Sequence, residues 1–429
     1  MKKARIYFVA LLCLFTAQFA FAQSDIQKKL SEISQIAKTE KLESTEFAEK
    51  YLAYFTQKID PKHDSVGTFQ QRVIVHHVGF DRPTVIVTEG YGGARALRPA
   101  YSEEISRLFN TNLVFVEHRY FLESTPQPKD WQYLTAENSA EDLHAIFTVL
   151  KKIYPNKWIS TGISKGGQTS IIYKAFFPND VDIAVPYVAP LCYDVEDGRH
   201  EPFLRNVSTA ENRKKIEDFQ LEVLKRRENL MPEFQKLCNE KNYKFNAPMN
   251  EIYDYCVLEY SFSFWQWGSD VESIPAQTAS DNEIFEHFIK LASPSYFGED
   301  RNTSFFVQAA HELGYYGYDI EPFKQYLSIQ SSKGYLKKLF LDEDVAKSLV
   351  FDKKLSTKLV DYLQKNDPKM MFIYGEVDPW TAVGATWLEG KQNIKVFIQP
   401  DGSHRARIST MPDEMKAEAI KTLEKWLEE

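Results

Sequence analysis

The stretch 158–177 constrains this chain more than any other, because a short apolar run meets a glycine-rich turn and then a helical pattern. Residues 158–161 have the β-type composition of a buried strand, and the apolar positions within 171–176 fall at helical spacing. Between them, 162–166 reads Gly-Ile-Ser-Lys-Gly, the G-x-S-x-G form of a nucleophile elbow. The glycines of such an elbow are needed because a Cβ would collide with the neighbouring strand and helix. Ser164 is therefore the candidate nucleophile.

Strand and helix patterns alternate on both sides of this turn. Apolar runs at 83–88 and 112–116 precede it, with a helix expected over 97–109 between them, and 183–188 is a further buried strand. The rhythm returns near the C-terminus with strands at 369–374 and 394–399, followed by a terminal helix. The alternation predicts an α/β protein with a mostly parallel sheet covered on both faces, and chemistry at the carboxyl ends of its strands.

The N-terminal part carries three local expectations. Residues 25–57 have apolar positions at helical spacing between many charges, so we expect N-terminal helices there, and 69–78 reads as a strand. His76 and His77 in that strand point to opposite faces, so they cannot bind one metal ion together. Ser139 begins a capping-box pattern, which predicts that a helix starts at that residue.

Residues 192–367 break the alternation. The stretch is helical and charged in its periodic parts and unusually aromatic, with runs such as Phe262 to Trp267 and Tyr315 to Tyr318. We expect a helical insertion lying as a lid over a core made of 23–191 and 368–429. Its aromatic side chains either pack the insertion's own core or form an inner wall that receives substrate.

The first 22 residues have the form of a secretory signal peptide. A basic start, an apolar run and the small-residue pattern Ala20-Phe21-Ala22 follow one another. We therefore expect an exported protein, periplasmic or secreted, that is not inserted in the membrane once the signal is cleaved. The signal contains three cations and no acids, and the whole chain has a net charge of -8, so an acidic surface argues against nucleic acid or an anionic membrane as partner.

The mature chain keeps Cys192, Cys238 and Cys256, an odd number without a C-x-x-C pair. At most one disulfide can form, with Cys238 to Cys256 as the candidate by proximity, and three buried free thiols are the alternative. No metal or organic cofactor is implied, and the sequence does not set the oligomeric state.

Two further loops supply partners for Ser164. A serine hydroxyl needs a base to take its proton, and the base needs a carboxylate to fix its tautomer. Asp378 follows the strand 369–374, and His404, the only histidine after Asp378, follows the strand 394–399. The chain order Ser, Asp, His on loops after strands is that of the α/β-hydrolase fold. The sequence thus predicts an α/β-hydrolase core with the triad Ser164, Asp378 and His404.

The oxyanion of a tetrahedral intermediate needs N–H donors placed in advance. In this fold one donor is the amide after the nucleophile, here that of Lys165, and the other comes from the loop after an earlier strand. That loop is Gly90 to Gly93, whose glycines let the backbone approach a substrate. Either Tyr91 or Gly92 is the second donor.

Eight stretches together resemble the serine peptidase family S37 of clan SC (PS-10 peptidase, prolyl tri/tetrapeptidyl aminopeptidases), with a more distant likeness to family S28. The resemblance implies an exported exopeptidase that has an α/β-hydrolase core and a helical lid and releases tri- or tetrapeptides, often after proline, from free N-termini. Lys165 and the Arg-Ala-Arg after His404 depart from the S28 pattern, so S37 fits better. The stretches are TFQQR (68–72), FDRPTVIVTEGYGG (80–93), EHRYF (117–121), YLTAENSAEDL (133–143), GISKGG (162–167), ELGYY (312–316), DPW (378–380) and GSH (402–404).

An exopeptidase of this kind needs a carboxylate to pair with the ammonium of its peptide substrate. Glu89, beside the oxyanion loop, and Glu312, in the ELGYY run, are the candidates, and a structural ion pair is the alternative for each. Trp380 is a candidate for the wall of a proline pocket. Two other functions keep the same fold: a carboxylesterase or lipase, and an inactive hydrolase fold that serves as a binding protein.

Overall fold

The computed structural model describes residues 23–298, 303–388 and 390–429. The expected signal, 1–22, lies outside the described residues. Within them, none of the helices combines the length and the apolar composition that crossing a membrane requires.

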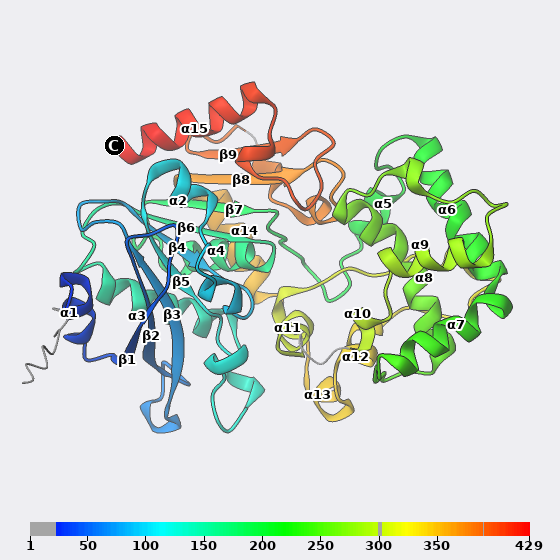
Figure 1. The fold of residues 1–429 in the computed structure, drawn as a ribbon, viewed down its shortest axis with the longest axis horizontal. Coiled ribbons are helices and arrows are strands. Elements are labelled where there is room, and N and C mark those ends of the chain that lie inside the picture. Colours follow the sequence, from blue (N-terminus) through cyan, green and yellow to red (C-terminus); the bar gives the residue numbers. More distant parts are fainter. Residues whose placement is uncertain (1–22, 299–302, 389) are drawn as a thin grey trace, which may run out of the picture.

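A single sheet of nine strands forms the centre of the fold (Figure 1). Its order is β1-β2-β3-β5-β4-β6-β7-β8-β9, in which β1, β2, β3 and β5 pair antiparallel and the pairs from β5 to β9 are parallel. The exchanged order of β4 and β5 and the parallel run after them are those of the α/β-hydrolase fold. The strands are β1 (Ile36–Leu42), β2 (Glu49–Lys58), β3 (Thr68–His77), β4 (Thr84–Thr88), β5 (Asn112–Val116), β6 (Trp158–Ile163), β7 (Ile183–Tyr187), β8 (Met370–Gly375) and β9 (Ile394–Gln399).

Helices cover both faces of the sheet, as the alternation predicts. Val85 and Val87 of β4 pack toward α2 and α15, whereas Ile86 between them packs toward α1 and α3. The four strands β4 to β7 are buried on both faces except at Ile163, which explains why their sequences are continuous apolar runs. The covering helices are α1 (Asp25–Ser31), α2 (Glu104–Phe109), α3 (Ala136–Leu150), α4 (Lys165–Phe176), α14 (Lys354–Lys365) and α15 (Asp413–Glu428).

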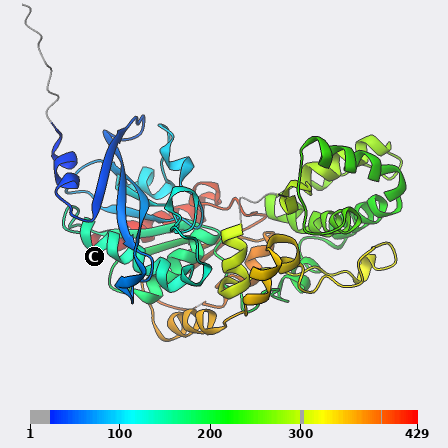
Figure 2. The same cartoon turned by 90° about the horizontal axis from the view of Figure 1, so that it is seen from below.

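The long segment between β7 and β8 is helical, as expected. In Figures 1 and 2, α6 to α9 form a lobe to one side of the sheet, and α11 to α13 lie between that lobe and the core. Aromatic side chains fill the interior of the insertion and its contact with the core. Its helices are α5 (His200–Leu204), α6 (Ala210–Lys225), α7 (Arg227–Glu240), α8 (Met249–Trp267), α9 (Asp281–Leu291), α10 (Ser295–Gly298), α11 (Thr303–Gln308), the π-helix η7 (Ala309–Leu313), α12 (Tyr335–Phe340) and α13 (Glu343–Ser348).

The insertion ends earlier than its expected limit at residue 367. Leu355, Leu359 and Leu363 of α14 pack in the same cluster as Ile171 and Ile172 of α4, so α14 covers the sheet. The helical spacing of its leucines resembles that of the lid helices, and sequence periodicity alone does not tell which body a helix packs on.

Three local expectations were wrong. Residues 25–57 form one short helix and then the strands β1 and β2, because β2 pairs with β1 and β3 and its Tyr51, Ala53 and Phe55 pack into one core cluster. Ser139 lies inside α3, which starts at Ala136 with Thr135 as its N-cap; the Thr135 hydroxyl accepts from the amide of Asn138. The helix expected over 97–109 is confined to 104–109.

Candidate active site

Ser164 lies at the strand, turn and helix arrangement that the sequence predicts. It joins β6 to α4 with φ +58° and ψ −122°, a backbone conformation that L-residues rarely adopt. A Cβ on Gly162 would lie 2.2 Å from the carbonyl oxygen of Gly166, so only glycine fits where the strand enters this turn. A serine held in such strain presents its hydroxyl at the carboxyl edge of the sheet.

Asp378 and His404 follow β8 and β9, which lie side by side on the same half of the sheet as β6. Their side chains are buried, and His404 Nδ1 lies 2.7 Å from Asp378 Oδ2. This bond leaves Nε2 as the basic nitrogen of the imidazole. Among the described residues no hydrogen bond joins Ser164 Oγ to His404, a contact that often tightens only when substrate binds.

The loop Gly90 to Gly93 is held from three directions. Lys165 Nζ donates to the carbonyl oxygen of Gly90 at 2.6 Å, and the amide of His118 donates to that of Tyr91 at 3.1 Å. The amide of Gly93 donates to Glu117 Oε2 at 2.6 Å. These contacts fix the loop before any substrate arrives, which an oxyanion site requires.

The amides of this loop are not equally free. Glu89 Oε1 accepts from the amide of Gly90 at 3.0 Å and from that of Tyr91 at 3.1 Å. In the part of the chain that the structure describes, the amides of Gly92 and Lys165 have no hydrogen-bond acceptor. Of the two predicted donors in the loop, the contacts therefore favour Gly92 in this state, together with Lys165.

The Lys165 side chain is buried beside the candidate nucleophile. Burial lowers the pKa of its ammonium to about 7, although Glu89 and Glu312 act in the opposite direction. The Nζ atom lies 5.7 Å from the centre of the Tyr91 ring and 5.4 Å from that of Phe121. When the Lys165 ammonium donates to the carbonyl oxygen of Gly90, it polarises the peptide group between Gly90 and Tyr91. This polarisation makes the Tyr91 N–H a stronger hydrogen-bond donor.

The EHRYF stretch supports the oxyanion loop, a role that the sequence did not reveal. Glu117 forms a buried ion pair with Arg72 of β3 and accepts from the hydroxyl of Ser124 at 2.7 Å. Arg119 is fully buried and binds both carboxylate oxygens of Asp142 at 2.7 and 2.8 Å. A charged motif directly after the buried strand β5 was the available signal, because such charges need internal partners.

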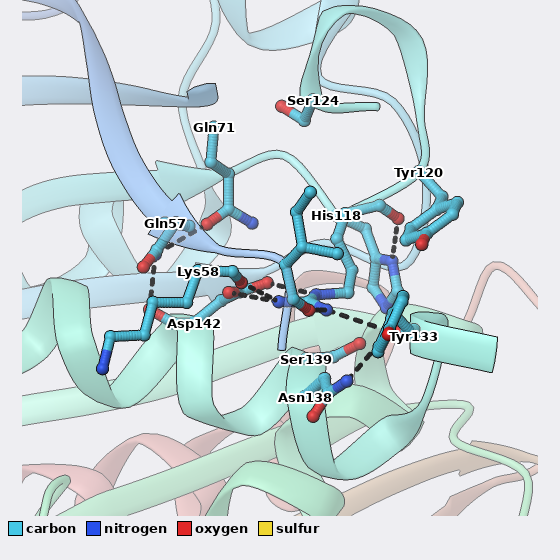
Figure 3. A network of polar contacts seen from close by, with 12 residues as sticks. Gln57, Lys58, Gln71, His118, Tyr120, Ser124, Tyr133, Asn138, Ser139 and Asp142 are labelled. Atoms are coloured by element: carbon cyan, nitrogen blue, oxygen red, sulfur yellow. Dashed lines mark hydrogen bonds and ion pairs between the residues drawn. The ribbon is translucent and has the colours of Figure 1, made fainter. Parts of the chain in front are cut away.

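Figure 3 shows the polar network around Asp142. Gln57 Nε2 donates to the carbonyl oxygen of Asp142 at 3.0 Å and to Gln71 Oε1 at 2.9 Å (Figure 3). Gln71 in turn donates to the carbonyl oxygen of Glu117 at 2.8 Å. Side chains of β2, β3 and α3 are thereby linked to the segment that holds the oxyanion loop.

Glu89 and Glu312, the expected receptors of a substrate amine, both have partners inside the protein. Glu89 binds Arg95 at 2.7 Å besides the two loop amides. Glu312 accepts from the amide of Ala136, the first residue of α3, at 2.6 Å, and burial raises its pKa to about 7. Their role toward an amine stays a prediction, and these contacts favour a structural one. Trp380, the candidate for the wall of a proline pocket, has its ring centre 6.4 Å from that of His404.

Open space adjoins the oxyanion loop. A cavity of about 640 Å³ is bordered by Tyr91 and Gly92 of that loop, by Phe121 and Trp131 of the core, and by Ser304 of the insertion. The loop therefore faces a space between core and insertion that is large enough for several amino-acid residues.

The three cysteines of the mature chain are unpaired in the described structure. Cys192, Cys238 and Cys256 are free and buried, so of the two expectations that of three free thiols holds and the Cys238 to Cys256 disulfide was wrong. Among the described residues no group of three or more His, Cys, Asp or Glu side chains is placed to hold a metal ion.

Comparison with known proteins agrees with this geometry. The family model described as PS-10 peptidase S37 matches residues 21–428. The chain is 30% identical over 426 residues to a prolyl tri/tetrapeptidyl aminopeptidase of Streptomyces mobaraensis. The aligned part covers 96% of this chain and 86% of that protein.

Solved structures show more distant likeness. A proline iminopeptidase of Mycobacterium smegmatis is 13% identical, with a TM-score of 0.43, over 87% of this chain and 98% of that one. An alpha/beta hydrolase enzyme from a deep-sea metagenome library of the Medee basin is 12% identical, with a TM-score of 0.38, over 82% and 94% of the two chains.

Proposed function

This chain belongs to the PS-10 peptidase S37 family, and from that premise we propose that it is an exported serine exopeptidase that releases tri- or tetrapeptides from free N-termini through an acyl-enzyme. The observation that carries the proposal is the strained Ser164 on the same sheet edge as the buried Asp378 and His404 pair. The residues have the types and the chain order that acyl transfer by a serine needs.

In the proposed reaction, Ser164 Oγ attacks the carbonyl carbon of the scissile peptide bond while His404 Nε2 takes the hydroxyl proton. Asp378 holds the opposite side of the imidazole at Nδ1 and stabilises its charged form. The oxyanion accepts from the amides of Lys165 and Gly92, with that of Tyr91 as the alternative to Gly92. The leaving amine takes the proton from His404, and a water activated by the same base then hydrolyses the ester on Ser164.

The choice of substrate rests on the named relative and on the lid. The Streptomyces protein is named for tri- and tetrapeptidyl aminopeptidase activity at proline, which supports short peptides with proline before the cleaved bond. The insertion lies to one side of the sheet (Figure 1), and its Ser304 borders the open space beside the oxyanion loop, which supports access by chain ends only. Export to the periplasm or the medium rests on the signal pattern in 1–22.

A matched set of fluorogenic peptides tests the proposal. Peptides of two to four residues that end in proline, each with a free or an acetylated N-terminus, would be compared for the native protein and Ser164→Ala. We expect cleavage of free-amine tri- or tetrapeptides, lost in the variant. Cleavage of p-nitrophenyl butyrate without cleavage of any peptide would instead support the carboxylesterase or lipase that shares this triad.

A further inference from the structure

Glu259, on α8 of the insertion, is a buried acid without a cation. Its Oε2 accepts from the hydroxyls of Tyr316 at 2.8 Å and Tyr318 at 2.7 Å, and its Oε1 accepts from Ser263 at 2.8 Å. Burial raises the pKa of this carboxyl to about 7. Burying a carboxylate without a positive group beside it costs free energy, so this site would bind a positively charged group of a ligand favourably.

No other buried carboxyl in the described part of the chain is held in this way. Each of the others has a basic side chain or a backbone N–H as partner, whereas Glu259 has hydroxyls alone. The others are Glu89, Glu104, Glu117, Asp142, Asp197, Asp254, Glu312 and Asp378.

Two unpartnered polar atoms lie in the same cluster of rings. Trp380 Nε1 and His200 Nε2 are buried and have no hydrogen-bond partner among the described residues. The Trp380 ring lies 5.4 Å from that of His200 and 5.5 Å from that of Tyr316. An indole N–H only donates, so a ligand that brings a carbonyl oxygen would satisfy it. Glu259 keeps 5% and Trp380 6% of its surface exposed, so the cluster is not sealed.

The cluster reaches the candidate catalytic base. Trp380 packs near both Tyr316 and His404, at ring-centre distances of 5.5 and 6.4 Å, so the Tyr316 ring centre lies no more than about 12 Å from the imidazole. The amide of His404 also donates to the carbonyl oxygen of Gln266 at 2.9 Å, and Gln266 lies on α8, the helix that carries Glu259. An extended peptide spans about 3.3 Å per residue, so three or four residues span roughly 10 to 13 Å.

We propose that the Glu259 carboxylate, together with the phenols of Tyr316 and Tyr318, binds the N-terminal ammonium of the peptide substrate, and that its separation from His404 sets the length of the released peptide. This inference rests on the proposed exopeptidase function and adds the residue that reads the substrate's amine. An ammonium brings three donors and a full charge, which a carboxylate, phenol oxygens and aromatic faces together satisfy. Trp380 Nε1 donates to a carbonyl of the bound peptide.

The first test compares Glu259→Gln with the native protein on matched free-amine and acetylated peptides. We expect kcat/KM for the free-amine peptides to fall about 100-fold, because a buried ion pair loses one partner. Turnover of p-nitrophenyl butyrate should be unchanged, which also shows that the variant is folded. The control is Glu251→Gln on the first turn of α8, whose surface pairing with Lys338 contributes little.

The outcomes separate the two proposals. If the native protein prefers free-amine peptides and Glu259→Gln keeps that preference, the exopeptidase function stands and the role of Glu259 is refuted. If the native protein cleaves free and acetylated peptides alike, or none, the exopeptidase function itself fails and the inference fails with it.

A second measurement needs no change at Glu259. Calorimetric titration of Ser164→Ala with a free-amine peptide at pH 6, in buffers of different ionisation enthalpy, counts the protons released on binding. We expect release of about one proton, because the substrate amine is charged at pH 6 and forces the protonated Glu259 to ionise. No release, or equal release with the acetylated peptide, would refute the site.

The other titratable groups that face Glu259 do not supply this proton. Burial raises the pKa of each of them above its ordinary value, so all are neutral at pH 6 and stay so. They are the phenols of Tyr296, Tyr315, Tyr316, Tyr318 and Tyr335 and the thiol of Cys256. His200, whose ring centre lies 5.9 Å from that of Tyr316, has its pKa lowered to about 4 by burial, so it is also neutral at pH 6.

Discussion

Replacing Ser164 with glycine is expected to leave the protein more stable than replacing it with alanine. Both variants lack the hydroxyl, so the difference between them reports the backbone at φ +58° and ψ −122°. Alanine keeps the strain of this conformation, which costs about 1 to 3 kcal/mol for a residue with a Cβ. Glycine relieves the strain but loses about 0.5 to 1 kcal/mol through its freedom in the unfolded chain.

Taken from the middle of both ranges, the net gain for glycine is therefore about 1 kcal/mol. The unfolding entropy is about 2.1 cal/mol/K per residue, so for a chain of about 400 residues the gain corresponds to a rise in Tm of about 1 to 2 °C. Scanning fluorimetry or calorimetry on purified Ser164→Gly and Ser164→Ala would measure this difference.

An exposed alanine in regular helix supplies the matched control. Ala417 lies in α15, where alanine is the favoured residue, so Ala417→Gly should lower stability by about 1 kcal/mol. Glycine in place of alanine is therefore expected to raise the stability at position 164 and to lower it at position 417. A Ser164→Gly variant no more stable than Ser164→Ala would refute the strained elbow and, with it, the preorganised nucleophile.

Three further results are expected. Gly90→Ala should lower kcat about 100- to 1,000-fold with little change in KM. The added Cβ would lie 2.7 Å from Lys165 Cγ and 2.8 Å from the amide nitrogen of Gly166, so it would displace the oxyanion loop. A change in KM alone would contradict this. Asp378→Asn should lower kcat about 10⁴-fold while the protein stays folded, because the amide no longer fixes the tautomer of His404; activity within tenfold of native would exclude Asp378 from the triad. The pKa of Lys165 is about 7 in the folded protein, below its ordinary value of 10.5, so between these pH values the unfolded chain binds more protons than the native protein. This difference makes the native protein more stable as the pH rises, and Lys165→Met should flatten that pH dependence. Parallel stability curves for the two proteins, measured by denaturant unfolding from pH 7 to 10, would show that Lys165 does not titrate there.

Local patterns in the sequence were enough to predict the parallel core and the loops that carry Ser164, Asp378 and His404. Each of these residues follows a continuous apolar run, and such runs are informative because the central strands are buried on both faces. Strands β1 and β2 of the antiparallel edge were missed because the apolar Phe47, Tyr51 and Phe55 fall four residues apart, as on one face of a helix, and only pairing with β3 makes β2 a strand.

The supporting residues could not be predicted because their partners lie far away in the chain. Glu117 meets Arg72 across 45 residues, and Glu259 meets Tyr316 across 57. The sequence shows that such acidic residues stand between apolar residues, but it does not show which distant residues they contact. The role of Lys165 toward Gly90 likewise depends on two strands that are neighbours in the sheet, β4 and β6.

The measurement that tests the account most directly is covalent labelling of the nucleophile. The native protein would be treated with a fluorophosphonate, digested and mapped by mass spectrometry, beside Ser164→Ala and His404→Ala. We expect one label per chain, on the peptide that contains Ser164, absent from Ser164→Ala and much slower to form in His404→Ala. No label on the folded native protein, or a label on another residue that persists in Ser164→Ala, would contradict the proposed triad.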